Sequence, residues 1–207
     1  MKDTLVVNLA EYDSSFSLSN KLGRLMWNMC YLFLFRPFNL AFFRKWRLFL
    51  LRAFGAKIGR ETHVYASAKI WAPWNLEMGE FSVMGPKVDC YNQGKIVIGD
   101  HTVISQKTYL CASSHDHTIF NFPLVLRPIE IGDQVWVAAD AFIGPGVSIG
   151  DGAVIAARAS VFQEVDSWTV VRGNPAGYVK DRRMKKTYRD FLQTVSPDLR
   201  QVSRCRL

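Results

Sequence analysis

The sequence predicts a parallel β-helix made of six-residue repeats, preceded by a helical segment. From Ile58 onward, aliphatic residues return at intervals of six, and a small residue often follows them, as in "IGDHTV", "IGDQVW" and "IGDGAV". A period of six fits neither an α-helix nor a half-buried strand, but it is typical of short strands that turn a corner every six residues. The thirteen residues of the series are Ile58, Val64, Ile70, Leu76, Ile98, Ile104, Leu110, Ile131, Val137, Ile143, Ile149, Ile155 and Val161.

Two interruptions of the series predict insertions. Three hexads make a coil of eighteen residues, whereas Leu76 and Ile98 are twenty-two apart, so four extra residues are expected in "VDCYNQGK". Leu110 and Ile131 are twenty-one apart where six are expected, which predicts fifteen inserted residues. Both insertions fall between the third and first faces, so they are expected at one corner, on adjacent coils about 4.8 Å apart. A long loop in a compact repeat is usually functional, which makes this corner a candidate site.

Residues 1–54 lack the six-residue period, and two helices broken near Pro37 are expected there. The segment "FRKWRLFLLRAF" places arginines among aromatic and leucine residues. It is interpreted either as a helical cap packed on the main domain or as an amphipathic segment on anionic lipid, and the two are compatible. The apolar run from Leu25 to Phe35 is eleven residues long, too short to span a bilayer.

Composition points to an intracellular protein with an anionic partner. The net charge is +8 and the pI is about 9.5, which favours a phosphate-rich ligand or a membrane surface, and no recognised motif supports nucleic acid. The four cysteines show no C-x-x-C spacing and are expected to be reduced. The polar start, "MKDTLVVNLAEYDSS", does not resemble a signal peptide, so a cytoplasmic location is expected.

Several motifs together resemble those of a known family. The hexapeptide series, "SHD" in its inserted loop, "IEIGDQVWVAADAFIGPGVSIGDGAVIAARASVF" and "RGNPA" resemble the left-handed β-helix (hexapeptide-repeat) acetyltransferases, with the colanic acid biosynthesis branch closest. The resemblance implies a left-handed prism, a homotrimer with active sites between subunits, and transfer of acetyl from acetyl-CoA to a sugar hydroxyl. The left hand comes from the family alone, since the general rule for parallel crossovers predicts the right.

The resemblance identifies His115 as the catalytic base, because it matches the loop histidine of the family. A sugar hydroxyl is barely ionised at neutral pH, and a neutral imidazole that accepts its proton accelerates attack typically by about 10² to 10⁴. Direct attack in a ternary complex is expected. Asp116 either orients the imidazole or caps the turn, and His117 either contacts substrate or lies in solvent.

Other residues are candidates for substrate or cofactor contacts. Asp89 and Asn92 lie in the smaller insertion and either bind the acceptor sugar or form an Asx turn. Ala139 and Ala157 are eighteen apart, so they are expected to stack and to let the pantetheine arm approach the backbone. Lys180 matches the family's basic residue near the phosphates of coenzyme A.

Arg172, Arg182 and Arg183 extend that cationic cluster. The chain departs from the family pattern at Arg158 and at Phe162, where a small residue and a threonine are usual. No metal is expected, because a zinc site of the carbonic anhydrase type needs three histidines and none follows His117.

The sequence therefore predicts a helical or amphipathic segment at 1–54, a β-helix acyltransferase domain at 55–179 with an inserted loop at 111–130, and a basic, helical tail at 180–207. The predicted function is O-acetylation of a glycan precursor, free or lipid-linked, with possible peripheral contact with the inner membrane surface. The alternatives are an acetyltransferase of free sugars, nucleotide sugars or other small molecules, and a non-catalytic trimeric scaffold.

Overall fold

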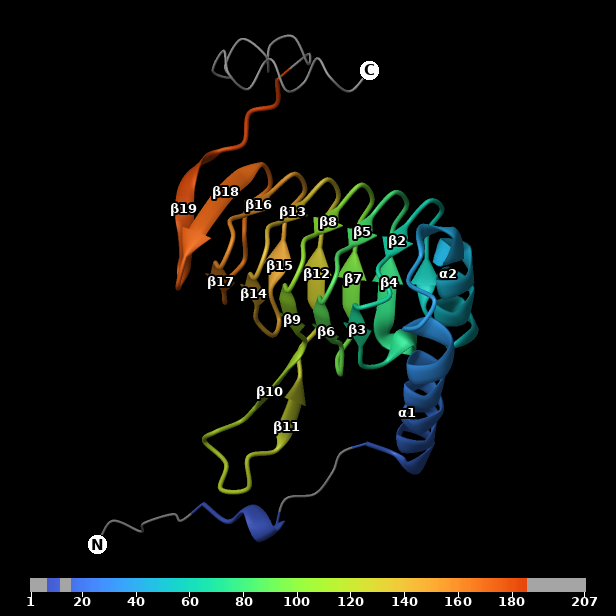
Figure 1. Ribbon diagram of the computed structural model, residues 1–207. Coiled ribbons are helices and arrows are strands. Elements are labelled where there is room, and N and C mark those ends of the chain that lie inside the picture. Colours follow the sequence, from blue (N-terminus) through green and yellow to red (C-terminus); the bar gives the residue numbers. More distant parts are fainter. Residues whose placement is uncertain (1–6, 12–15, 186–207) are drawn as a thin grey trace, which may run out of the picture.

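The computed structural model describes residues 7–11 and 16–185 of the 207-residue chain. It contains a β-helix whose short strands form three parallel sheets, with two α-helices at its N-terminal end and a hairpin at its C-terminal end (Figure 1). An additional two-stranded arm projects from one corner of the prism. The predicted fold is confirmed.

Each sheet takes one strand from each successive coil. Sheet A contains β1 (Lys57–Ile58), β4 (Leu76–Met78), β7 (Ile96–Ile98), β12 (Ile129–Ile131) and β15 (Ser148–Ile149). Sheet B contains β2 (His63–Val64), β5 (Val83–Met84), β8 (Val103–Ile104), β13 (Trp136–Val137), β16 (Val154–Ile155), β18 (Thr169–Gly173) and the antiparallel β19 (Ala176–Asp181). Sheet C contains β3 (Lys69–Ile70), β6 (Asp89–Tyr91), β9 (Tyr109–Cys111), β14 (Phe142–Ile143) and β17 (Ser160–Val161).

The strand register corrects one insertion. Ile58 pairs with Met78, and Met78 with Ile98, so the first two coils each have twenty residues. The predicted four-residue insertion is therefore wrong: each of these coils has two extra residues at its corner between sheets C and A. Leu76 fits the six-residue spacing from Ile70, but Met78, buried on the same face of β4, is the residue that pairs with Ile58 and Ile98. The large insertion is confirmed at the same corner, since Ile98 pairs with Ile131 across thirty-three positions.

The core consists of inward-facing aliphatic side chains stacked from coil to coil, and Ile104, Leu110 and Ile155 are fully buried. The corners after sheet A are joined by aspartates of the "IGD" motifs. The Asp133 carboxylate accepts from the Asp100 N–H at 2.7 Å, and the Asp151 carboxylate accepts from the Asp133 N–H at 2.8 Å. These bonds satisfy turn N–H groups that the sheets do not use.

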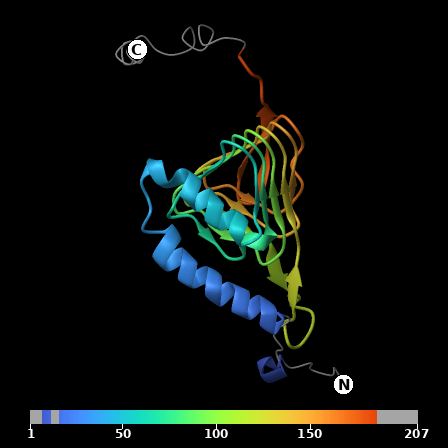
Figure 2. The ribbon, with the colours of Figure 1, turned by 90° about the vertical axis from the view of Figure 1, so that its right-hand side faces the viewer.

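The N-terminal helices pack on the first coil (Figure 2). Helix α1 (Leu18–Cys30) continues as a π-helical turn (Tyr31–Phe35), and a 3-10 turn (Ala41–Phe43) leads into α2 (Arg44–Ala53), so the predicted break near Pro37 is confirmed. Trp27 is fully buried and donates from Nε1 to the Ile70 carbonyl at 2.7 Å. None of the helices among the described residues is long and apolar enough to cross a membrane.

The start of the predicted tail differs from expectation. Lys180 and Asp181 belong to β19, which pairs with β18, and residues 182–185 have no regular structure. The prediction of a helix beginning at Lys180 is therefore wrong for 180–185, because pairing with β18 satisfies this part of the backbone instead. Residues 186–207, which carry the rest of the predicted helical tail, lie outside the described residues.

Candidate active site

The inserted residues form an arm, defined here as Ser113–Leu126. Its strands β10 (Ser113–His115) and β11 (Leu124–Leu126) pair antiparallel, with His115 opposite Leu124. Figure 1 shows the arm extending beyond the end of sheet C, away from the body of the prism. The sequence predicted a protruding loop and missed the hairpin, although the apolar run "PLVL" is a signal for its second strand.

His115 is exposed at the end of β10, and its ring is held by the return strand of the arm. Nδ1 lies 2.6 Å from the carbonyl oxygen of Phe122. Since a carbonyl oxygen only accepts, Nδ1 carries the hydrogen in this contact, and the neutral ring then has its lone pair on Nε2. Fixing the tautomer through the second ring nitrogen is the arrangement that a histidine base requires.

Asp116 contacts the turn of the arm rather than the imidazole in the hydrogen bonds of the structure. One oxygen of its carboxylate accepts from the Thr118 hydroxyl at 2.6 Å and from the Thr118 N–H at 2.9 Å. These two hydrogen bonds lower the pKa of Asp116. This geometry favours the turn-capping alternative, and Phe122 takes the orienting role. His117 is exposed in the same turn.

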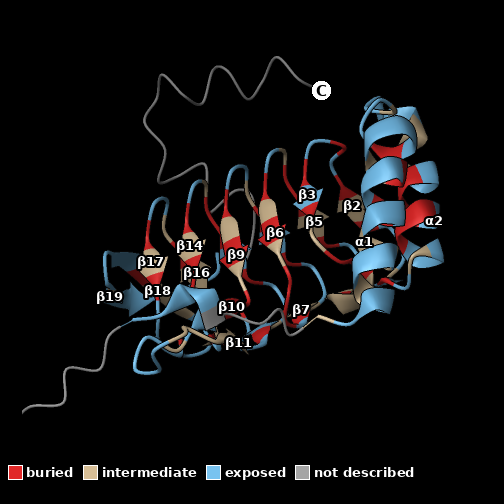
Figure 3. Ribbon diagram, turned by 90° about the horizontal axis from the view of Figure 1, so that it is seen from below, coloured by how far each residue is buried: buried red, intermediate tan, exposed pale blue. Residues whose placement is uncertain are grey.

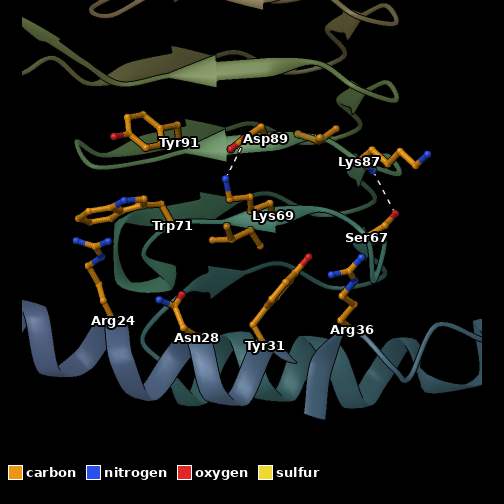
Figure 4. Close-up of a pocket in the computed structure, with 12 residues that line it drawn as sticks. Arg24, Asn28, Tyr31, Arg36, Ser67, Lys69, Trp71, Lys87, Asp89 and Tyr91 are labelled. Carbon is orange, nitrogen blue, oxygen red and sulfur yellow. Dashed lines mark hydrogen bonds and ion pairs between the residues drawn. The ribbon is translucent and has the colours of Figure 1, made fainter. Parts of the chain in front are cut away.

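Asp89 lies in a groove between α1 and the outer face of sheet C, called the helix groove below (Figure 4). The cavity volume is about 770 Å³, and Asp89 pairs at 3.3 Å with Lys69, its neighbour on the adjacent strand of the same wall. Tyr31 enters the groove from the helical side, and its pKa is raised by burial and by the Asp89 carboxylate. The predicted substrate residue therefore stands in a concave site of the size that small ligands occupy.

Asn92 is fully buried in the corner after β6. Its side-chain oxygen accepts from the N–H groups of Trp71 and Ala72 at 3.0 and 3.1 Å, and its amide donates to the Ala72 carbonyl at 2.6 Å. These bonds join the corners of the first two coils. Asn92 thus stabilises the fold by linking these two corners, and the site proposed below does not include it.

A second cavity, of about 800 Å³, lies where the β18–β19 hairpin meets sheet B. Lys180 and Arg183 contribute cations to it, and Trp136 and Tyr178 contribute aromatic rings. Arg182 has a structural role, because its guanidinium donates hydrogen bonds to the carbonyls of Gln134 and Gly152.

Arg172 is exposed on β18 but does not line this cavity.

Ala139 and Ala157 occupy equivalent corners between sheets B and C on successive coils. The Arg158 N–H donates to the Ala139 carbonyl at 3.0 Å, which confirms the predicted stacking of the two corners. Arg158 turns outward and pairs with Asp140 at 3.2 Å. The side chain of Phe162 is exposed and packs beside Phe142, with ring centroids 5.5 Å apart.

One chain brings together only part of the predicted site. Asp89 and the arm belong to adjacent coils, because Tyr91 at the end of β6 pairs with Cys111, two residues before the arm begins. Lys180 lies on the terminal hairpin, at the end of the prism opposite the helices (Figure 1). Among the described residues, no group of three or more histidine, cysteine, aspartate or glutamate side chains is arranged to hold a metal ion.

Comparison with known proteins agrees with this architecture. Residues 128–163 match the family model of the bacterial transferase hexapeptide (six repeats). The colanic acid biosynthesis acetyltransferase WcaF of Escherichia coli K12 is 49% identical over 138 residues, which cover 67% of this chain and 76% of WcaF. The chain belongs to the hexapeptide-repeat acetyltransferases. It is therefore an acetyltransferase, as its sequence predicted.

Solved structures show the same fold at lower identity. A hexapeptide-repeat acetyltransferase of Vibrio cholerae, complexed with acetyl coenzyme A, superposes with a TM-score of 0.73 at 24% identity, covering 84% of this chain and 94% of its own. A galactoside acetyltransferase in complex with coenzyme A superposes with a TM-score of 0.66 at 21% identity, covering 82% and 86%. These neighbours are left-handed β-helices, in agreement with the predicted hand.

Proposed function

We propose that the protein transfers acetyl from acetyl-CoA to a sugar hydroxyl of a glycan precursor, with His115 as the general base. The observation that carries the proposal is the contact of His115 Nδ1 with the Phe122 carbonyl, which assigns the basic lone pair to Nε2. Nε2 accepts the hydroxyl proton as the sugar oxygen attacks the thioester carbon. When the C–S bond breaks, the imidazolium returns that proton to the departing sulfur. The ester and the free thiol of coenzyme A are the products.

The cavity at the terminal hairpin fits the nucleotide end of acetyl-CoA. Lys180 and Arg183 suit its phosphates, and the rings of Trp136 and Tyr178 offer surfaces for adenine. The stacked corners at Ala139 and Ala157 leave room for the pantetheine arm beside the prism. When bound, acetyl-CoA supplies the activated acetyl group, and its complexes with a related fold support this assignment.

A homotrimer is part of the proposal, because the arm needs a partner. An isolated two-stranded hairpin is marginally stable in water, and this arm exposes Ile119, Phe120 and Leu126. Lys180 lies at the far end of the same chain. Packing of the arm against a second copy would cover its apolar side chains and bring His115 to the coenzyme groove of the neighbour.

We also propose that the helical end of the molecule contacts the cytoplasmic surface of the membrane and receives lipid-linked acceptors there. The outward side of α1 exposes Leu22, Leu25 and Met29, each more than 50% accessible (Figure 3). Phe33 and Phe49 are exposed on neighbouring helical segments. Lys21 and Lys45 are exposed cations near these apolar side chains in the sequence, as expected for anionic lipid.

Acetyl transfer is tested with His115→Ala, and His117→Ala, an exposed histidine of the same arm, is the comparison variant. Thiol release from acetyl-CoA and product mass are measured across nucleotide sugars and lipid-linked glycans. Loss of general-base catalysis lowers kcat/KM by about 10² to 10⁴. His117→Ala keeps the proposed base and is expected to lose far less activity than His115→Ala, and both variants should bind acetyl-CoA by calorimetry. Full transfer by a folded His115→Ala protein overturns the assignment of the base, and absence of acetyl-CoA binding favours a scaffold.

Membrane contact is tested by sedimentation with vesicles of phosphatidylcholine and phosphatidylglycerol. Leu22→Glu/Met29→Glu removes exposed apolar side chains without touching the core, and is expected to abolish most of the pelleting. Equal pelleting of the two proteins would remove the membrane from the proposal.

A further inference from the structure

The helix groove is strongly cationic for a site that binds a neutral sugar. Arg24, Arg36, Lys69 and Lys87 line it, and Asp89 is the single lining carboxylate among the residues that the structure describes. Asp89 is paired with Lys69. The other three cations have no ion pair with an acidic side chain among the described residues. Their charge is therefore available to an anionic ligand.

The groove has two chemically different ends (Figure 4). At one end, Trp71 and Tyr91 form an aromatic wall, and the guanidinium of Arg24 lies 3.7 Å from the centre of the Trp71 ring. At the other end, Arg36 extends from the helical side toward Ser67 and Lys87. The Asp89–Lys69 pair lies between them.

The aromatic end is the one next to the catalytic arm. Tyr91 pairs with Cys111, and the Ala112 N–H donates to the Tyr91 carbonyl at 3.2 Å, immediately before the arm begins. The Ser67 and Lys87 end lies at the opposite edge of sheet C, in the turns that enter β3 and β6. A ligand lying along the groove thus has one end near the arm and the other among cations.

We propose that the acceptor is a sugar carrying a diphosphate, and that Arg36 and Lys87 bind the diphosphate while Trp71, Tyr91 and Asp89 hold the sugar. This proposal rests on the proposed function, whose acceptor it specifies. Aromatic side chains pack against the apolar faces of sugar rings, and a carboxylate accepts hydrogen bonds from the sugar hydroxyl groups. Arginine and lysine are the side chains that bind phosphate oxygens most effectively. The groove, at about 770 Å³, is large enough for both parts.

The proposal is tested on the full chain with inorganic pyrophosphate as the probe, in magnesium-free buffer, by calorimetry. Arg36→Gln/Lys87→Gln removes both proposed ligands and is expected to raise the dissociation constant at least about tenfold. Lys57→Gln/Lys107→Gln removes the same charge outside the groove, and Glu77 keeps its second partner, Lys95, at 3.0 Å. This control should bind pyrophosphate about as the unchanged protein does.

Asp89→Asn is expected to change the pyrophosphate affinity in the opposite direction. It removes the only lining carboxylate and releases Lys69, so pyrophosphate affinity is expected to rise about twofold or more. Acetyl transfer should fall in the same variant, because the sugar loses its hydroxyl acceptor. A variant that was merely unfolded would lose both.

The source of the diphosphate is distinguished by comparing uridine diphosphate with farnesyl diphosphate. Tighter binding of the first indicates a nucleotide sugar, and tighter binding of the second indicates a lipid-linked sugar. Absence of pyrophosphate binding, or equal weakening by the groove pair and the control pair, overturns the proposal. Acetyl-CoA binding is measured in parallel. If the unchanged protein does not bind acetyl-CoA, the proposed function is contradicted. If it binds acetyl-CoA but not pyrophosphate, only this inference is contradicted.

Discussion

Arg47 is expected to hold the helical end onto the β-helix, and its replacement tests that role. The side chain is only 1% exposed, although it carries a full charge. Its guanidinium donates to the carbonyls of Val64 at 3.0 Å, Phe38 at 2.6 Å and Leu40 at 3.1 Å. Arg47 therefore joins the second strand of the prism to the connection between the two helices. Arg47→Met keeps an unbranched apolar stem and removes every donor.

The magnitude follows from the three hydrogen bonds that are lost. A hydrogen bond to a charged group contributes about 1.5–3 kcal/mol, but carbonyls near a segment that loosens regain water and recover part of this. Removing one partner from a buried charged network typically costs about 3–5 kcal/mol, which is the destabilisation expected here. Since domains are stable by about 5–15 kcal/mol, this loss is large enough to release the helices under mild conditions.

Urea unfolding followed by tryptophan emission and by far-UV circular dichroism measures the effect. Four of the six tryptophans lie in or against the helical end, so the emission transition of Arg47→Met should occur at lower urea than that of the unchanged protein; they are Trp27, Trp46, Trp71 and Trp74. Lys45→Met, an exposed cation on the same helix, is the control and should shift stability by no more than about 0.5 kcal/mol. A change below about 1 kcal/mol in Arg47→Met refutes the reasoning.

Three further predictions concern the prism. Partial burial, with Arg47 and Arg44 nearby, lowers the pKa of His63, so the unfolded chain binds the proton more tightly than the folded protein does. The free energy of unfolding should therefore decrease as pH falls below about 6.5. Urea titrations at several pH values should show that His63→Gln flattens this decrease. Burial raises the pKa of the Cys90 thiol, so iodoacetamide at pH 8 should leave it unmodified in the native protein and label it after unfolding, as read by peptide mass spectrometry. Gly99→Ala places a methyl group against the Asp133 carboxylate and 2.7 Å from the Gly132 carbonyl carbon, so thermal unfolding should show a loss of about 1–3 kcal/mol, and an unchanged midpoint would contradict the tight packing of these corners.

The six-residue period predicted most of the fold because every inward position of the β-helix requires a buried aliphatic side chain. Ile98, Ile104 and Leu110 are all buried in the same core, and their regular spacing of six residues follows from this. The exception is instructive. Leu76 and Met78 lie on the same face of a three-residue strand, so both are buried, and spacing alone does not decide which one pairs with Ile58.

The candidate site was only partly predictable. A break in a regular pattern is visible in sequence, so the protruding arm was predicted, and the family resemblance singled out His115 within it. The helix groove was missed, because Arg24 and Arg36 come from the non-repetitive segment and face Lys69 and Lys87 only after the helices pack on sheet C. The orienting partner of His115 was missed for a related reason: it is the backbone carbonyl of Phe122, which leaves no signature in the residue types.

The stacked coils also fix the distance between the helix groove and the arm. The groove is built on the coils that carry β3 and β6, and the arm leaves the coil after β6, so β6 and the base of the arm are one strand spacing apart, about 4.8 Å. Inserting or deleting a complete coil would change that separation by one such step while leaving every repeat intact. If the groove binds the acceptor as proposed, the length of acceptor that reaches His115 is adjustable in discrete increments, set by the coil from which the arm departs rather than by changes in either surface.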